Sequence, residues 1–96
     1  MYDNRYKFEW DEGKNSENVL KHGISFEDAR LAFFDSNSII MPDRAHSADE
    51  DRFFCVGKVE SEIATVRFTM RGERIRIFGA GYWRRGKWVY ENEERN

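Results

Sequence analysis

Residues 66–77 read Val-Arg-Phe-Thr-Met-Arg-Gly-Glu-Arg-Ile-Arg-Ile, two runs of alternating apolar and polar side chains around a glycine. Alternation with a period of two is typical of β-strands, because successive side chains point to opposite faces of a sheet. If residues 71–72 form a two-residue hairpin loop, Arg67 pairs directly with Arg76. The stretch therefore predicts an antiparallel hairpin with one apolar face and one basic face.

The two faces of this hairpin differ in chemistry. The face expected to join the core carries Val66, Phe68, Ile75 and Ile77. The opposite face carries Arg67, Thr69, Arg74 and Arg76. Arginines directly opposite each other repel, so such a face needs a neighbouring acid or a bound anion. Two interpretations stay open: Glu50, Glu62 or a C-terminal acid neutralises the arginines, or the arginines bind phosphate, whose oxygens match the guanidinium fork.

The distribution of charge along the chain supports an anionic partner. The 96 residues contain 16 Lys and Arg and 18 Asp and Glu, for a net charge of -2. Residues 1–50 carry an excess of five negative charges, whereas residues 51–96 carry an excess of three positive charges. Such asymmetry points first to nucleic acid. Because the total is slightly negative, any basic function must be local.

Length and composition exclude several classes of protein. A chain of 96 residues is expected to form one domain, residues 1–96. No apolar run approaches the ~20 residues that cross a membrane, and residues 1–5 lack the pattern of a signal peptide. A lone Cys55 cannot form an internal disulfide and reads as a small buried side chain. These features are typical of a cytoplasmic protein without a membrane partner.

The first third of the chain predicts a strand and two helices. Residues 6–10 alternate as a short strand, and Asp11 is suited to cap a helix that runs to about His22. Gly23 follows it as a typical helix-ending residue. Ser25 is expected to cap a second helix. Its buried face is marked by an apolar stripe of Phe26, Ala29, Ala32 and Phe33.

The remainder predicts mainly strands. A short strand at residues 39–41 is followed by a polar, acidic loop at 43–51. Longer segments are expected as strands 52–58, 62–69 and 74–80 and as a helix at 83–94. The element order indicates an α+β fold in which two N-terminal helices pack on a mainly antiparallel sheet, with a C-terminal helical segment.

Several motifs in this order resemble the signature of the BrnT toxin family. The N-terminal part of the resemblance is Phe8-Glu9-Trp10-Asp11, Lys14-Asn15, Asn18, Lys21-His22-Gly23-Ile24-Ser25-Phe26-Glu27 and Ala29. It continues through Phe33, Asp35, Asp43, His46-Ser47, Glu50, Arg52, Gly57, Phe68-Thr69, Arg71, residues 74–77 and Tyr90-Glu91. The resemblance implies a RelE-like ribonuclease toxin of a type II toxin–antitoxin system that cuts RNA and arrests translation. It also implies a BrnA-like, DNA-binding antitoxin as partner, in a hetero-oligomer on operator DNA.

The chain departs from this family at the end of one strand. Many members read R-I-I-S-A-R where residues 76–81 read Arg-Ile-Phe-Gly-Ala-Gly, so a serine and an arginine are missing. We expect the missing basic group to be supplied by Arg84, Arg85 or Lys87.

RNA can be cleaved without metal, because its own 2′-OH attacks the adjacent phosphate if protons are moved and charge is stabilised. The expected catalytic residues are Arg67, Arg71, Arg76, Glu50, His46 and His22. The expected RNA-binding residues are Arg52, Thr69, Arg74, Lys21, Arg84, Arg85 and Lys87. Tyr90 is a weaker candidate for proton transfer, and Tyr82, Trp83 and Trp88 either stack bases or serve the core or the antitoxin.

Each proton-transfer candidate also has a structural interpretation. His22 is suited to a helix-end cation, His46 to a solvated loop position, and Glu50 to an ion pair with Arg52 or Arg76. Two histidines and one cysteine at distant positions match no metal-ligand spacing, so we expect no metal ion and no cofactor. The alternative function is a non-catalytic module that binds nucleic acid or antitoxin through the basic face.

Overall fold

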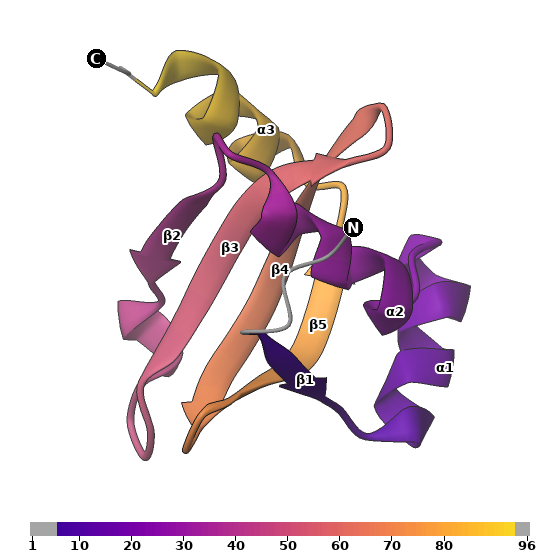
Figure 1. Ribbon diagram of the computed structural model, residues 1–96, viewed down its shortest axis with the longest axis vertical. Coiled ribbons are helices and arrows are strands. Elements are labelled where there is room, and N and C mark those ends of the chain that lie inside the picture. The colour runs from indigo at the N-terminus through magenta and orange to yellow at the C-terminus, as the bar shows by residue number, and fades with distance from the viewer. Residues whose placement is uncertain (1–5, 94–96) are drawn as a thin grey trace.

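The computed structural model describes residues 6–93 and contains one five-stranded sheet (Figure 1). The strand order is β1-β5-β4-β3-β2, with β1 parallel to β5 and every other neighbour antiparallel. The strands are β1 (Lys7–Glu9), β2 (Ile39–Pro42), β3 (Arg52–Val59), β4 (Glu62–Arg71) and β5 (Arg74–Gly81).

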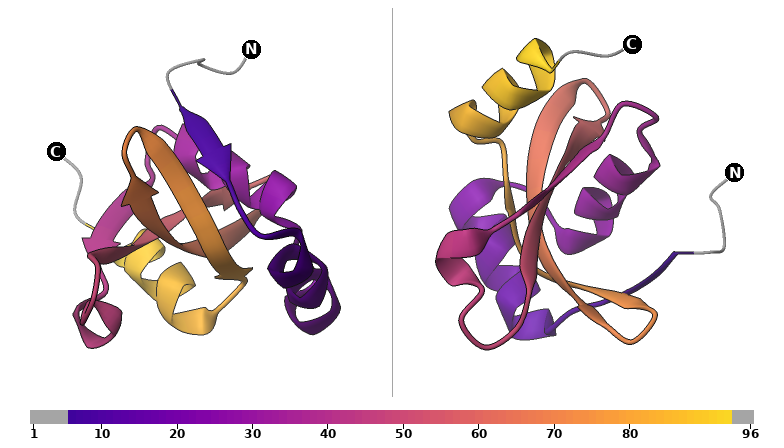
Figure 2. Two further views of the ribbon diagram at one scale, coloured as in Figure 1. Left: turned by 90° about the horizontal axis from the view of Figure 1, so that it is seen from below. Right: turned by 90° about the vertical axis from the view of Figure 1, so that its left-hand side faces the viewer.

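Helices lie on both faces of this sheet (Figure 2). They are α1 (Glu12–His22), α2 (Phe26–Ala29), the 3-10 helices η1 (Arg30–Phe34) and η2 (Arg44–His46), and α3 (Arg84–Asn92). The segment α2–η1 covers one face, α3 lies against part of the other, and α1 flanks β5. The predicted α+β arrangement is confirmed, although the predicted helix end at residue 94 falls outside the described residues. Within residues 6–93, no helix has both the length and the apolar character needed to cross a membrane.

Local hydrogen bonds explain where the first two helices begin and end. The side chain of Asp11 accepts from the backbone N–H of Lys14 at 2.9 Å, and Gly23 ends α1 in the left-handed conformation with φ 72°. Ser25 Oγ accepts from the backbone N–H of Asp28 at 3.0 Å. The predicted capping residues are therefore confirmed.

The core lies between the sheet and α2–η1. The predicted apolar stripe of the second helical segment is buried, with Phe26 and Ala29 fully inaccessible. It packs on the sheet side chains Cys55, Val66, Phe68, Ile75 and Ile77. Gly57 permits this close approach, because a Cβ at that position would overlap the backbone oxygen of Ala32.

The predicted register of the β4–β5 hairpin is wrong. Arg71 pairs with Arg74, so the loop is Gly72-Glu73, and Arg76 lies opposite Thr69 rather than opposite Arg67. Gly72 has φ 62°, and glycine first in a two-residue loop suits the twist of a hairpin, which explains the shift. Because the pairing moves by two positions, each side chain keeps its predicted face.

Candidate functional site

One face of the sheet is basic. It is the face opposite α2–η1, in the part that α3 leaves uncovered. We call it the basic face, and its arginines are Arg52 from β3, Arg67 and Arg71 from β4, and Arg74 and Arg76 from β5. The predicted clustering of these side chains is thus observed, although the partners across the strands differ.

Two carboxylates each contact two of these arginines. Glu50 lies 3.4 Å from Nε of Arg52 and 3.5 Å from Nη2 of Arg71. The sequence predicts an ion pair of Glu50 with Arg52 or Arg76. The pair with Arg52 is observed, and the second partner is Arg71 rather than Arg76.

The second carboxylate belongs to Glu9 of β1. Its two oxygens lie 3.0 Å from Nη1 of Arg76 and 3.9 Å from Nε of Arg74. Sequence reasoning missed Glu9 in this role, because nothing in the local pattern of β1 says that it pairs in parallel with β5. The alternation of residues 6–10 indicated only that Lys7 and Glu9 share a face.

Arg67 is arranged differently from the other four arginines. It forms no ion pair with any residue between 6 and 93, and its guanidinium lies 5.2 Å from the ring centroid of Phe78. Arg52 lies over the same ring at 4.6 Å. Phe78 follows Arg76 by two positions in β5 and therefore shares the basic face, and a bulge at Phe78 brings Gly79 opposite Arg67. An aromatic floor therefore holds two guanidinium groups close together.

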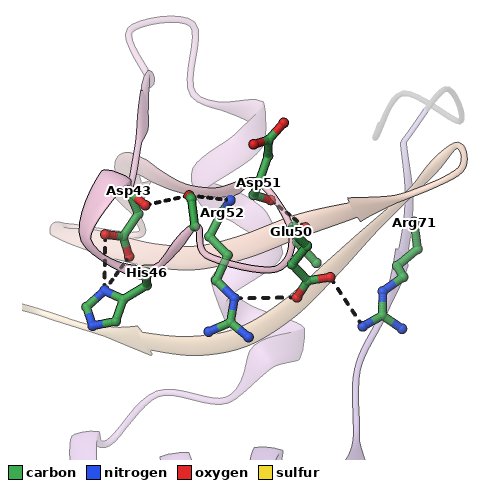
Figure 3. Close-up of polar contacts among 8 residues, drawn as sticks. Asp43, His46, Glu50, Asp51, Arg52 and Arg71 are labelled. Carbon is green, nitrogen blue, oxygen red and sulfur yellow. Dashed lines mark hydrogen bonds and ion pairs between the residues drawn. The ribbon is translucent and has the colours of Figure 1, made fainter.

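His46 lies on the loop beside Arg52 and is oriented by Asp43 (Figure 3). Its Nδ1 is 3.0 and 3.1 Å from the two carboxylate oxygens of Asp43, which is 4% exposed. The side chain of His46 is 56% exposed. This arrangement assigns Nδ1 as the hydrogen-bonded nitrogen and leaves Nε2 to exchange a proton with a bound molecule.

The loop that carries His46 and Glu50 is tied to the sheet (Figure 3). Ser47 Oγ donates to the carbonyl of Asp43 at 2.6 Å and accepts from the backbone N–H of Arg52 at 3.0 Å. Thr69 is buried, and its hydroxyl donates to the carbonyl of Asp51 at 2.6 Å. Thr69 therefore positions the loop from within the sheet.

The remaining predicted residues lie at several places outside the cluster of five arginines. Lys21 and His22, at the end of α1, border a polar cavity of about 270 Å³ that Arg67 closes on the other side. Arg85 on α3 borders a separate, mainly apolar cavity of about 380 Å³ with Met41 and Phe54. Arg84 is exposed at the start of α3. Lys87 groups instead with Lys58, Glu62 and Glu91.

The family departure at residues 78–81 has a structural counterpart. A Cβ at Gly81 would lie 2.6 Å from Cε2 of Trp83, so the indole occupies the space beside this backbone. Trp83 in turn packs against His22, with ring centroids 5.2 Å apart. An aromatic pair thus stands next to Gly81, the position where the family pattern expected from the sequence has an arginine.

Two further groups have structural roles. Burial, with a smaller contribution from the charge of Asp35, raises the pKa of Cys55 to about 12, so this thiol is inert. Tyr90 donates a hydrogen bond to Asp35 at 2.5 Å. Within residues 6–93, no three His, Cys, Asp or Glu side chains gather closely enough to hold a metal ion.

The sequence of the chain matches a known protein family. A family model described as "Ribonuclease toxin, BrnT, of type II toxin-antitoxin system" matches residues 10–86, a range that includes every arginine of the basic face. No curated protein matches the sequence. A type II toxin implies an RNA substrate here and a cognate antitoxin. The chain therefore belongs to the BrnT family of ribonuclease toxins of type II toxin–antitoxin systems.

Proposed function

We propose that this toxin cleaves RNA on the basic face, without a metal ion, by attack of a 2′-OH on the adjacent phosphate. The observation that carries the proposal is that five arginines share one face and that an Asp-oriented histidine lies beside one of them, Arg52 (Figure 3). Arginines supply the positive charge that a metal ion supplies in other nucleases. The acid–base group and the charge are thus both provided by the chain.

The arginines bind the phosphate and stabilise the charge that builds up on it. Arg67 is best suited to contact the reacting phosphate, since no carboxylate among residues 6–93 pairs with it. Glu50 holds Arg52 and Arg71 in place beside it, as Glu9 holds Arg76. Glu50 is therefore proposed as a positioning residue.

His46 carries the proton transfer in this mechanism. Nε2 takes the proton of the 2′-OH as its oxygen forms a bond to phosphorus, and the bond from phosphorus to the 5′ oxygen breaks. Water protonates the departing 5′ oxygen. The products are a 2′,3′-cyclic phosphate and a 5′-OH end. Asp43 keeps the ring in the tautomer that presents Nε2 as a base.

The cellular role follows from this chemistry. We propose that cleavage inhibits translation in the cytoplasm and that a BrnA-like antitoxin neutralises the toxin. The net charge of -2 supports assigning operator DNA binding to the antitoxin within the hetero-oligomer, because the toxin as a whole does not attract DNA.

Cleavage of end-labelled RNA by the purified chain tests the mechanism. We expect cleavage in excess EDTA, 2′,3′-cyclic phosphate ends, and no cut where the 2′-OH is methylated. A requirement for divalent ions, or cutting beside a 2′-O-methyl group, contradicts it. If the purified chain binds RNA or antitoxin but cuts no RNA under any of these conditions, the non-catalytic module is the correct function.

A further inference from the structure

A polar cavity adjoins the basic face on the side of α1. It has a volume of about 270 Å³, near the lower end of the range for small-molecule sites. The lining residues that matter here are Lys14, Lys21, His22, Arg67, Gly79 and Trp83. They come from α1, from β4 and β5, and from the residue before α3. At this cavity the N-terminal helix meets the basic face.

The lining combines cations and flat rings with one carboxylate, that of Glu17. Lys14 and Lys21 lie on one side and Arg67 on the other, and Lys21 has only a 3.8 Å contact with the exposed Glu17. Trp83 and His22 form an edge-to-face pair with an interplanar angle of 75°. Cations next to an aromatic wall suit a ligand that carries both a phosphate and a planar ring.

The backbone leaves the cavity open. Gly79 does not have a positive φ, and the nearest atom to a Cβ there is Cδ of Arg67 at 3.4 Å, which is ordinary van der Waals contact. The backbone therefore does not require glycine at position 79. The missing side chain instead leaves space in the cavity. In contrast, the side-chain amide of Asn18, which also lines the cavity, already has its hydrogen-bond partners. Its Nδ2 donates to the carbonyls of Ile24 and Ala80, and its Oδ1 accepts from the backbone N–H of Ala80.

Arg67 links the cavity to the basic face. Its guanidinium stacks over Phe78 on that face, and the same side chain lines the cavity. An RNA strand whose phosphate contacts Arg67 therefore has its neighbouring nucleotide at the cavity.

We propose that this cavity binds one nucleotide of the RNA beside the cleaved bond, with its base against Trp83 and its phosphate between Lys21 and Arg67. The site selects which phosphodiester is placed on the basic face. This inference rests on the proposed function, because it takes RNA to be the substrate that crosses that face.

Equilibrium binding of a non-cleavable, 2′-O-methylated oligonucleotide tests the site. The variant Lys21→Gln/His22→Ala alters exposed side chains of α1, and Lys58→Gln, which also removes a lysine charge, is the control away from the cavity. We expect the α1 variant to bind roughly 5- to 100-fold more weakly and with a less steep salt dependence, and the control to match the wild type. With cleavable RNA, the α1 variant should raise KM.

Gly79→Leu, which fills the cavity, and Gly79→Ala, which adds only a Cβ, provide a second test. We expect Gly79→Leu to change the distribution of cut sites on a long RNA and Gly79→Ala to preserve it. Unchanged binding and cut sites in the α1 variant overturn the proposal. If the α1 variant binds RNA as the wild type does but binds the antitoxin more weakly, the cavity belongs to the antitoxin interface instead. If the wild type cuts no RNA, the proposed function fails. If it cuts but these variants cut identically, only the nucleotide site fails.

Discussion

The imidazole of His46 is held at Nδ1 by the carboxylate of Asp43, 3.0 Å away. Asp43 is buried, whereas more than half of the His46 side chain is exposed. A buried acid thus orients a solvent-facing ring at the border of the basic face.

Replacing His46 with Gln should lower the single-turnover cleavage rate about 10²- to 10⁴-fold, as expected for loss of a general base. Asp43→Asn should reduce the rate while His46 remains present. A His46→Gln enzyme that cleaves at the wild-type rate would assign proton transfer to another group.

Arg67→Gln should lower the cleavage rate about 10²- to 10³-fold, because the variant lacks the arginine that no described carboxylate neutralises. Since Arg67 has no ion pair with residues 6–93, the melting temperature should change little. The measurement is single-turnover kinetics together with thermal unfolding of the same samples. A large fall in melting temperature would instead identify a structural arginine.

Arg71→Ala and Arg76→Ala should each abolish growth arrest on induced expression while the protein still binds its antitoxin. Both side chains are partly exposed and pair with a surface carboxylate, so their loss should cost only about 0–1 kcal/mol of stability. Co-purification with antitoxin checks that the variants are folded. If either variant fails to fold, that arginine serves the structure rather than catalysis.

Tyr90→Phe should destabilise the fold at neutral pH by about 1–2 kcal/mol, through loss of a hydrogen bond to a carboxylate. Burial opposes ionisation of Asp35, but hydrogen bonds from Tyr90 and from the backbone N–H groups of Asn37 and Lys58 outweigh it and lower the pKa of Asp35.

The lowered pKa of Asp35 predicts how the stability effect of Tyr90→Phe changes with pH. A lowered pKa contributes stability that is present above the unfolded value of about 3.9 and is lost as pH falls through the folded value. The difference in unfolding free energy between wild type and Tyr90→Phe should therefore narrow below about pH 4. Denaturant titrations at pH 7 and pH 3 measure it, and a difference that widens in acid would contradict the sign.

Gly86→Ala should destabilise the protein, even though alanine is more favourable than glycine within a helix by about 1 kcal/mol. A Cβ at position 86 would overlap Oγ1 of Thr65, a buried hydroxyl that has no hydrogen-bond partner among the described residues. Removing that hydroxyl with Thr65→Ala should restore most of the stability in the double variant. A double-mutant cycle of unfolding free energies checks this coupling, and strict additivity would refute the packing of α3 on β4.

Local chemistry made much of the fold predictable. Asp11, Gly23 and Ser25 act within a few residues of their own positions, so their capping roles could be inferred from sequence. The faces of the hairpin were also predictable, because side-chain alternation is independent of the partner strand. Its register was not, since it depends on whether Gly72 stands first or second in the loop.

The candidate site was only partly predictable, because local patterns do not specify which distant segments of the chain come together. Arg67, Arg71 and Arg76 share a strand pair, so periodicity brings them together. Glu9 reaches Arg76 from 67 residues away in the chain, through a parallel pairing that no local pattern encodes. The Asp43 orientation of His46 and the Phe78 bulge likewise depend on tertiary packing.

Glu9 and Glu50 have a consequence for which anions the face admits. Four of the five arginines already hold an intramolecular carboxylate, so a phosphate that binds any of these four must displace an existing negative charge. A single small anion gains little from such an exchange. A polynucleotide can displace both acids at once, because its phosphates are linked and arrive together. We therefore expect these four arginines to favour a strand over free phosphate and mononucleotides.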